Sequence, residues 1–246
     1  MKITALIAKR AENPHENKLP TIAFLGDSVT QGCFEIYQKN DRSFETVFDS
    51  ENGYPAKVKK LLSLLYPQTP VHIINAGISG DSAPGGLDRL ERDVLVYNPD
   101  LVIVSYGLND MCGGAEKLET YKTALSEIFD KIIKFGAEII FMTPNLTCTQ
   151  VSCHIKYEEL REFSKMLVEL NNNKTADKYM DAAKDVCRCR DVPVCDCYEK
   201  WKLLAKNGVE TTELLANYLN HPNRDMDWLF AASLIDVMMR ETDMML

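Results

Sequence analysis

The chain has 246 residues, enough to bury a full hydrophobic core in one large domain or two small ones. Apolar residues make up 46% and charged residues 26% of the sequence, a balance that excludes disordered, collagen-like and coiled-coil proteins. Because 36 acidic residues outnumber 28 lysines and arginines and no basic block is present, we expect neither a nucleic acid nor a membrane surface as a partner.

The N-terminal apolar run, residues 3–8, is shorter than a signal-peptide core and leads directly into Lys9 and Arg10. No stretch of the sequence approaches the roughly 18 apolar residues of a membrane span. We therefore expect a cytoplasmic protein. In that compartment the eight cysteines are expected to be free thiols.

Five short apolar, β-branched runs predict strands, and their near-continuous hydrophobicity is typical of parallel strands covered on both faces. These runs are residues 21–25, 71–74, 101–105, 138–142 and 193–197. Apolar residues at helical spacing predict helices over residues 54–65, 118–135, 156–170, 174–187 and about 225–240. The alternation of strand and helix predicts an α/β domain built on a parallel five-stranded sheet.

No internal repeat and no linker rich in glycine, proline or serine divides the chain. We therefore predict one domain over residues 1–246, with residues 1–18 as an N-terminal extension. Residues 34–53 form the least regular stretch, in which aromatic and polar residues are mixed. Because a long loop inside a compact domain usually serves a site, we expect this segment to border the functional pocket.

Four short polar blocks stand where an α/β protein places its ligands. They are residues 26–28 (GDS), 79–81 (SGD), 107–110 (GLND) and 221–223 (HPN). The first three follow predicted strands, and the fourth opens the last predicted helix. Ligands of open α/β sheets bind beyond the carboxyl ends of the strands, so the blocks are expected to converge there.

These four blocks, in this order and spacing, resemble those of the SGNH hydrolases, also called the GDSL family of esterases and acylhydrolases. The resemblance extends from about Leu19 to the final helix, and it implies a flavodoxin-like three-layer α/β/α sandwich. It also implies Ser28 as the nucleophile and His221 as the general base. The Ser28 N–H, the Gly80 N–H and the Asn109 side-chain amide correspond to the oxyanion hole of the family.

The chemistry of these residue types agrees with such roles. A serine hydroxyl is a poor nucleophile unless a neighbouring base takes its proton during the attack. Histidine suits that task because its unperturbed pKa is about 6.5. The tetrahedral intermediate carries negative charge on the former carbonyl oxygen, so neutral N–H donors must be aimed at that position in advance.

The sequence departs from the family at one position. An aspartate usually lies three residues before the histidine and orients its ring, whereas this chain has Tyr218 there. Any acceptor for the His221 Nδ1–H can replace it: a backbone carbonyl of the same loop, or the side-chain oxygen of Asn217 or Asn220. We therefore predict a Ser–His dyad with a neutral orienting group. The alternative is a non-catalytic SGNH-fold binding protein.

A cluster of four cysteines within eleven residues provides enough thiols for a tetrahedral zinc ion; they are Cys187, Cys189, Cys195 and Cys197. The C-x-C spacing differs from the usual zinc pattern. Cys195 and Cys197 are also expected to share one face of a predicted strand. We therefore predict buried free thiols here, no metal and no cofactor.

The leading functional hypothesis is a serine ester hydrolase that forms an acyl-enzyme on Ser28 with a small-molecule ester. The aromatic and polar mixture of residues 34–53 suits a sugar, so short acyl esters of carbohydrate-like alcohols, acetyl esters above all, are the expected substrates. A thioesterase or lysophospholipase is the alternative within the enzymes. No lid-like amphipathic helix lies near the four blocks, as a long acyl chain would require. The sequence specifies no oligomeric state.

Overall fold

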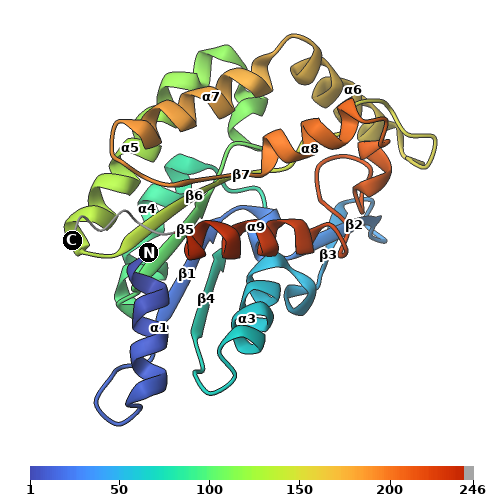
Figure 1. Cartoon of the computed structure of the whole chain (residues 1–246). Coiled ribbons are helices and arrows are strands. Elements are labelled where there is room, and N and C mark those ends of the chain that lie inside the picture. Colours follow the sequence, from blue (N-terminus) through green and yellow to red (C-terminus); the bar gives the residue numbers. More distant parts are fainter. Residues whose placement is uncertain (241–246) are drawn as a thin grey trace.

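The fold is centred on a five-stranded parallel sheet in the order β4–β1–β5–β6–β7 (Figure 1). We describe residues 1–240 of a computed structural model, so the last six residues of the predicted domain lie outside the description. The strands are β1 (Thr21–Gly26), β4 (His72–Gly77), β5 (Leu101–Ser105), β6 (Glu138–Thr143) and β7 (Val194–Asp196). All neighbouring pairs are parallel. Numbered within the sheet this order is 2-1-3-4-5, the flavodoxin-like arrangement, so the predicted fold class is confirmed.

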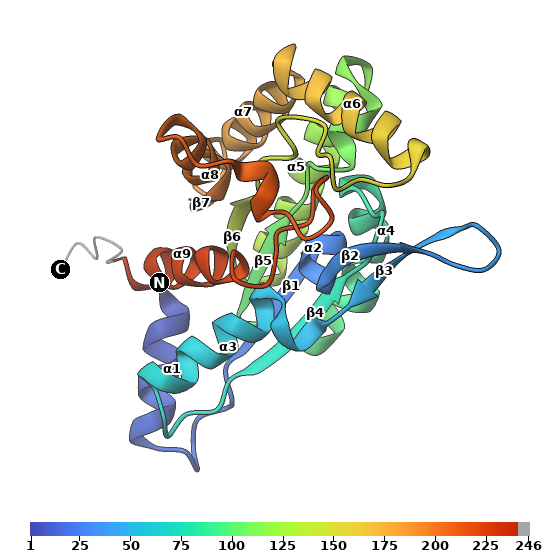
Figure 2. The same ribbon diagram turned by 90° about the vertical axis from the view of Figure 1, so that its right-hand side faces the viewer.

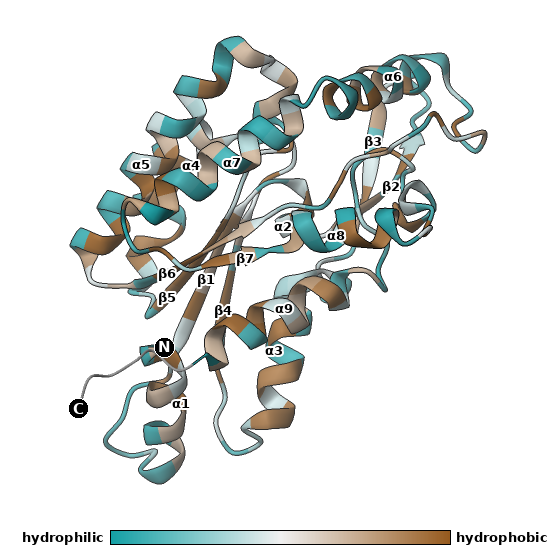
Figure 3. Cartoon of the chain, turned by 45° about the horizontal axis from the view of Figure 1, so that its top comes forward, coloured by the Kyte–Doolittle hydropathy of each residue, from teal (hydrophilic) through white to brown (hydrophobic). Residues whose placement is uncertain are grey.

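Helices cover both faces of the sheet and complete three layers (Figure 1). One layer holds α4 (Ala83–Asp93), α5 (Leu118–Phe135) and α7 (Thr175–Arg188), with α6 (Glu158–Asn172) packed on α7. The other holds α1 (Lys2–Glu12), α3 (Tyr54–Leu65), α9 (Asp227–Met239) and, beside α9, α8 (Cys197–Lys206). Hydrophobic strands lie between these layers, and every residue of β1 and β5 is buried, as expected of strands covered on both sides (Figure 3).

The short elements are α2 (Ser28–Gln31) and the 3-10 turns η1 (Ser50–Asn52), η2 (Leu95–Tyr97), η3 (Asp110–Gly113), η4 (Ala115–Lys117) and η5 (Thr211–Leu214). The longer predicted helices are found within two residues of their expected bounds, and α3 and α5 match them at both ends. In α5 a buried stripe that includes Leu125, Ile128 and Ile132 faces the core, and Gly136 (φ 98°) ends the helix in the left-handed region. None of the helices described between residues 1 and 240 is long and apolar enough to cross a bilayer.

The N-terminal segment, predicted as an extension, packs against the hydrophobic core. In α1 the side chains of Ile3 and Ile7 are fully buried. The first turn of the helix is also anchored, because the N–H groups of Lys2 and Ile3 donate to the Glu138 carboxylate at 2.9 and 2.8 Å. A carboxylate at a helix N-terminus satisfies free N–H groups and interacts favourably with the helix dipole.

Residues 34–53, predicted as an irregular loop, contain an antiparallel hairpin of β2 (Cys33–Gln38) and β3 (Phe44–Phe48). The hairpin projects from the sandwich beyond the carboxyl ends of β1 and β4 (Figure 2). Arg42 (φ 68°) lies in the turn between the two strands. Neither strand alternates apolar and polar residues, and most of their residues are only partly buried, so the sequence pattern did not reveal the hairpin.

Helices α4 and α8, like α1, were not predicted. Gly85 and Gly86 lower the helix propensity of α4. A Cβ atom on Gly86 would lie 2.3 Å from the Tyr106 hydroxyl, so the close packing of α4 requires glycine. Helix α8 begins directly after β7 because the Asp196 side chain accepts from the Glu199 N–H at 3.2 Å and caps it.

The cysteine cluster differs from its prediction in two respects. Cys197 opens α8 instead of continuing the strand, although its sulfur remains 3.7 Å from that of Cys195. Cys189 is exposed, whereas Cys187, Cys195 and Cys197 are buried. Within the part of the chain described, no three His, Cys, Asp or Glu side chains are grouped so as to hold a metal ion.

Candidate active site

Three of the four polar blocks lie together where the order of the strands in the sheet reverses. Strand β1 lies between β4 and β5, so the segments that follow these strands are neighbours. Ser28 is the first residue of α2, immediately after β1, and Asp27 caps that helix by accepting from the Val29 N–H at 3.0 Å. The Gln31 side chain accepts from the Ser79 N–H at 2.6 Å and so ties the segment of Gly80 to α2.

The fourth block brings His221 to Ser28. The Nε2 atom of His221 lies 3.0 Å from the Ser28 hydroxyl, and each residue is only 4% exposed. The loop that carries His221 is stabilised by the Asn217 side-chain oxygen, which accepts from the N–H groups of Leu219, Asn220 and His221 at 2.9–3.0 Å. The histidine is therefore held by its backbone as well as by its ring.

The other ring nitrogen of His221 bonds to a residue that the sequence analysis did not consider. Nδ1 lies 3.0 Å from the backbone carbonyl oxygen of Phe34, in β2. Because a carbonyl only accepts, Nδ1 carries the proton, and Nε2 is left as an acceptor for the Ser28 hydroxyl. The predicted orienting groups Asn217 and Asn220 are corrected: the Asn220 side-chain oxygen accepts from Asn217 Nδ2 at 2.9 Å.

Tyr218 does not contact the Nδ1 side of the histidine. Its ring stacks on His154, with centroids 4.9 Å apart and planes 26° apart. Tyr218 also has a left-handed backbone conformation, with φ 58°. The residue at the family's aspartate position is thus directed to another part of the surface.

Arg224 fixes the hairpin against the histidine loop. Its guanidinium donates to Glu35 at 2.6 Å and to Asp49 at 2.7 Å, and lies 4.3 Å from the centre of the Phe34 ring. Glu35 lies in β2 and Asp49 directly follows β3, and the pKa of each carboxyl is lowered chiefly by its hydrogen bond to Arg224. The clamp therefore holds the Phe34 carbonyl in reach of His221.

The surroundings of His221 favour the neutral imidazole. Burial lowers its pKa from 6.5 to about 4, and the hydrogen bond to Phe34 offsets only part of that effect. At pH 7 the ring is therefore uncharged and can accept the proton of Ser28. A carboxylate at the orienting position would instead have raised the pKa by attracting the imidazolium charge.

Three N–H donors are available near Ser28. Ser28 is the first residue of a helix, so its N–H has no acceptor within that helix. Gly80 has φ 79°, and a Cβ atom there would meet no atom within 4 Å, so the backbone borders open space. The Asn109 amide donates one hydrogen to the Asp81 carbonyl at 2.7 Å, which fixes its orientation and leaves its second hydrogen free.

Arg89, in α4, holds together the strand ends that lead into these segments. The sequence analysis missed this residue because α4 was not predicted. Its buried guanidinium donates to the carbonyls of Ala76 and Gly26 at 2.6 and 2.9 Å, and so bridges the ends of β4 and β1. It also donates to the Tyr106 hydroxyl at 2.8 Å and pairs with Asp81 at 2.7 Å. The cation thus binds all three strand ends that carry the candidate site.

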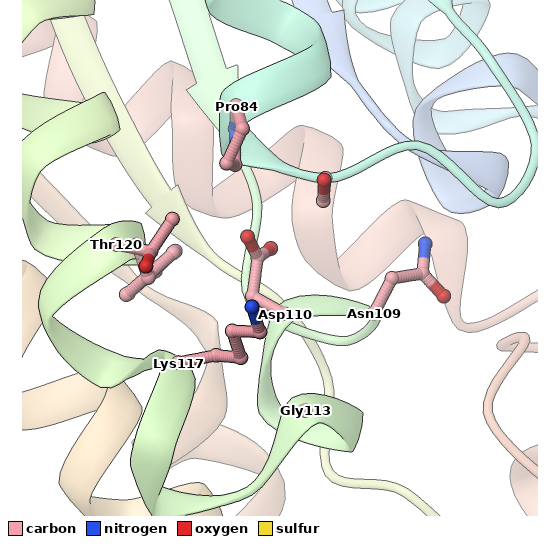
Figure 4. A pocket seen from close by; sticks show the side chains of 8 residues that line it. Pro84, Asn109, Asp110, Gly113, Lys117 and Thr120 are labelled. Carbon is pink, nitrogen blue, oxygen red and sulfur yellow. The ribbon is translucent and has the colours of Figure 1, made fainter.

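Two buried carboxyl groups lie close to the site without contacting the Ser28 hydroxyl. Burial raises the pKa of Asp27 to about 7 and that of Asp110 to about 6. Asp110 accepts from the Ala83 N–H at 3.0 Å and borders a cavity of about 290 Å³ (Figure 4). In this cavity the Asp110 carboxyl points toward the segment before Pro84, while the Asn109 side chain points away from Lys117 and Thr120.

Two related proteins are named as esterases. An acetylxylan esterase from Geobacillus stearothermophilus is 34% identical over 132 residues, which cover 50% of this chain and 58% of that protein. An arylesterase from Vibrio mimicus is 33% identical over 97 residues, covering 37% of this chain and 48% of the relative. The chain thus spans about half the length of the curated relatives that it matches.

Solved structures show the same fold. A variant of an acetyl-xylooligosaccharide esterase from Geobacillus superposes with a TM-score of 0.66 at 22% identity, covering 90% of this chain and 95% of that one. The sequence model of the GDSL-like Lipase/Acylhydrolase family matches residues 24–228, which include all four polar blocks. The chain therefore belongs to the GDSL-like lipase/acylhydrolase family.

Proposed function

We propose that the chain is a serine esterase that removes short acyl groups, acetyl above all, from carbohydrate-like alcohols through an acyl-enzyme on Ser28. The observation that carries the proposal is the 3.0 Å contact between the Ser28 hydroxyl and a neutral His221 whose other nitrogen is held by the Phe34 carbonyl. A hydroxyl next to an oriented, uncharged base is the arrangement that nucleophilic catalysis needs.

In the first half-reaction the Ser28 oxygen bonds to the ester carbonyl carbon while the hydroxyl proton moves to His221 Nε2. The carbonyl oxygen becomes an oxyanion, which the Ser28 N–H, the Gly80 N–H and the free hydrogen of Asn109 stabilise. The bond between the carbonyl carbon and the alcohol oxygen then breaks. The proton on Nε2 passes to that oxygen, and the alcohol leaves.

In the second half-reaction water repeats these steps on the acyl-enzyme. His221 Nε2 takes a proton from the water as its oxygen bonds to the acyl carbon, and the proton returns to the Ser28 oxygen when the acid is released. The Phe34 carbonyl keeps Nδ1 protonated throughout. It stabilises the transient imidazolium less than a carboxylate does, because it carries only a partial charge.

The acetyl and carbohydrate parts of the proposal have separate support. The 4% exposure of Ser28 and His221 leaves a narrow approach, which favours a small acyl group. The similarity to a protein named acetylxylan esterase supports a sugar alcohol.

The test compares p-nitrophenyl acetate, butyrate and octanoate in wild type and Ser28→Ala. We expect acetate to have the highest kcat/KM, and we expect the variant to lose the activity together with labelling by a fluorophosphonate probe. A kcat/KM that rises with chain length favours a thioesterase or lysophospholipase. If wild type neither turns over the acetate nor reacts with the probe, the chain is a binding protein that retains the fold.

We further infer a cytoplasmic location. Its support is the buried pair Cys195 and Cys197, whose sulfurs lie 3.7 Å apart as free thiols, a state that cytosolic reductants maintain. Fractionation of cells that produce the untagged protein tests the inference, and recovery in a secreted fraction contradicts it.

A further inference from the structure

We propose that a groove beside the histidine loop binds the sugar chain attached to the acylated unit, so that Tyr218 and Tyr37 serve the alcohol side of the substrate. The groove, called here the aromatic groove, has a volume of about 430 Å³ and is lined by residues 35–37, 154–157, Leu160 and 216–218. This inference rests on the proposed esterase function and specifies where its substrate extends.

The lining of the groove is rich in aromatic rings from three separate segments. The stacked pair of Tyr218 and His154 leaves 55% of the His154 side chain exposed. Tyr37, in β2, is 47% exposed, and Tyr157 is held by edge contact with Phe44 at 5.2 Å. Exposed rings held by neighbouring rings form rigid flat surfaces, and these match the apolar C–H faces of pyranose rings.

Polar groups at the edges of the groove can bind sugar hydroxyls. The Glu35 carboxylate is fixed by Arg224 yet keeps 46% of its side chain exposed. Lys156 is exposed, and the tyrosine hydroxyls and the His154 ring nitrogens add both donors and acceptors. Flat apolar surfaces with hydrogen-bonding edges distinguish a sugar from a long acyl chain, which needs a continuous apolar channel.

The groove adjoins the histidine loop, because residues 216–218 of that loop line it. His221 Nε2 must deliver a proton to the alcohol oxygen, so the alcohol sits against the histidine loop. Two groove residues are also linked to the catalytic base: Glu35 follows Phe34, the acceptor for Nδ1, and the Asn217 side chain accepts the His221 N–H. The Phe34 carbonyl occupies the orienting position, which leaves Tyr218 available for substrate.

The test uses Tyr37→Ala and Tyr218→Asn, because asparagine tolerates the positive φ of residue 218 better than alanine does. Tyr97→Ala, which removes an exposed tyrosine remote from the groove, is the matched control. Each protein is assayed with O-acetylated xylotetraose and with p-nitrophenyl acetate, which has no sugar. Loss of one stacking ring is expected to raise KM for the tetrasaccharide about tenfold.

For both groove variants we expect the loss of kcat/KM on the acetylated tetrasaccharide to exceed the loss on p-nitrophenyl acetate at least fivefold, with Tyr97→Ala equal to wild type. Tyr37→Phe, which keeps the ring, should restore most of the affinity. Equal losses on both substrates would mean that the variants only disturb the histidine loop, and no loss on either would mean that the groove is unused. Either result overturns the inference.

A binding measurement separates failure of this inference from failure of the proposed function. Unacetylated xylotetraose is titrated into wild type and Tyr37→Ala, and binding is followed by calorimetry. Binding that the variant loses supports the groove even if wild type hydrolyses no acetylated sugar, in which case only the proposed reaction fails. Hydrolysis of p-nitrophenyl acetate by a wild type that does not bind xylotetraose overturns the groove and leaves the esterase intact.

Discussion

Protonation of His221 is expected to stop catalysis only in strongly acidic solution. Burial lowers the pKa of the ring from 6.5 to about 4, which corresponds to about 3 kcal/mol against the imidazolium. This value already includes the opposing effect of the Phe34 carbonyl, which lies 3.0 Å from Nδ1, and a carboxylate in its place would oppose the effect of burial more strongly. The acidic limb of kcat/KM for p-nitrophenyl acetate should therefore have its midpoint at about pH 4, with full activity by about pH 6.

The assay covers pH 3.5 to 8 and records circular dichroism at each point, because acid also weakens the fold. Unfolded His221 binds a proton below about pH 6.5, whereas the folded residue resists protonation until about pH 4. The contribution of the neutral ring to stability is therefore lost as the pH falls through that window. An NMR titration of the His221 ring, assigned with His221→Ala, attributes the limb to this residue. A ring that titrates near 6.5 in folded protein refutes the reasoning.

Four further predictions follow from the same contacts. Ser28→Ala should abolish ester hydrolysis while shifting Tm by less than about 2 °C, and His221→Ala should cost nearly as much activity because the two side chains act as one unit; wild-type turnover by either variant would exclude its assigned role. Asp27→Asn should raise Tm more at pH 8 than at pH 5, because burial raises the Asp27 pKa from 3.8 to about 7 and the cost of folding this carboxyl grows as the pH rises through that window; equal gains at the two pH values contradict this. Arg89→Ala should lower the free energy of unfolding in urea by about 3–5 kcal/mol, since a buried carboxylate and two strand-end carbonyls lose their donor; a change below about 1 kcal/mol would show that the guanidinium is dispensable. Arg224→Ala should lower kcat about ten- to a hundredfold with little change in KM, because the hairpin that carries the acceptor for Nδ1 loses its clamp; reduced stability with unchanged kcat would show that the clamp is only structural.

The sheet could be predicted because its signal is local. Strands such as Leu101–Ser105 are buried on both faces and are continuous in hydrophobicity, and helix Leu118–Phe135 repeats its apolar residues at helical spacing. Signals that depend on tertiary contacts were missed. Ile3 and Ile7 form a stripe too short to identify a core helix, and the two glycines of α4 are explained only by the neighbouring Tyr106.

The candidate site, too, could be predicted only in part. Ser28, Gly80 and Asn109 each follow a strand, so the sheet order alone brings them together, and the family pattern adds His221. What holds the imidazole could not be predicted, because a backbone carbonyl is present at every residue and has no sequence signature. The sequence pointed only to side chains and carbonyls near His221 in the chain, whereas the acceptor lies 187 positions away.

A main-chain acceptor makes the tautomer of the catalytic base independent of side-chain identity. No replacement at residue 34 other than a change of backbone shape can delete the carbonyl that holds Nδ1. Carbonyl directions alternate along an extended strand, however, and the pairing of β2 with β3 is already irregular between Cys33 and Ile36. Inserting or deleting one residue between Gly32 and Phe34 would turn the carbonyl to the other side of the hairpin. The site would then lose its activity, although both side chains of the dyad remained. In this chain the length of that short connection therefore matters more for the tautomer of His221 than the identity of the residues within it.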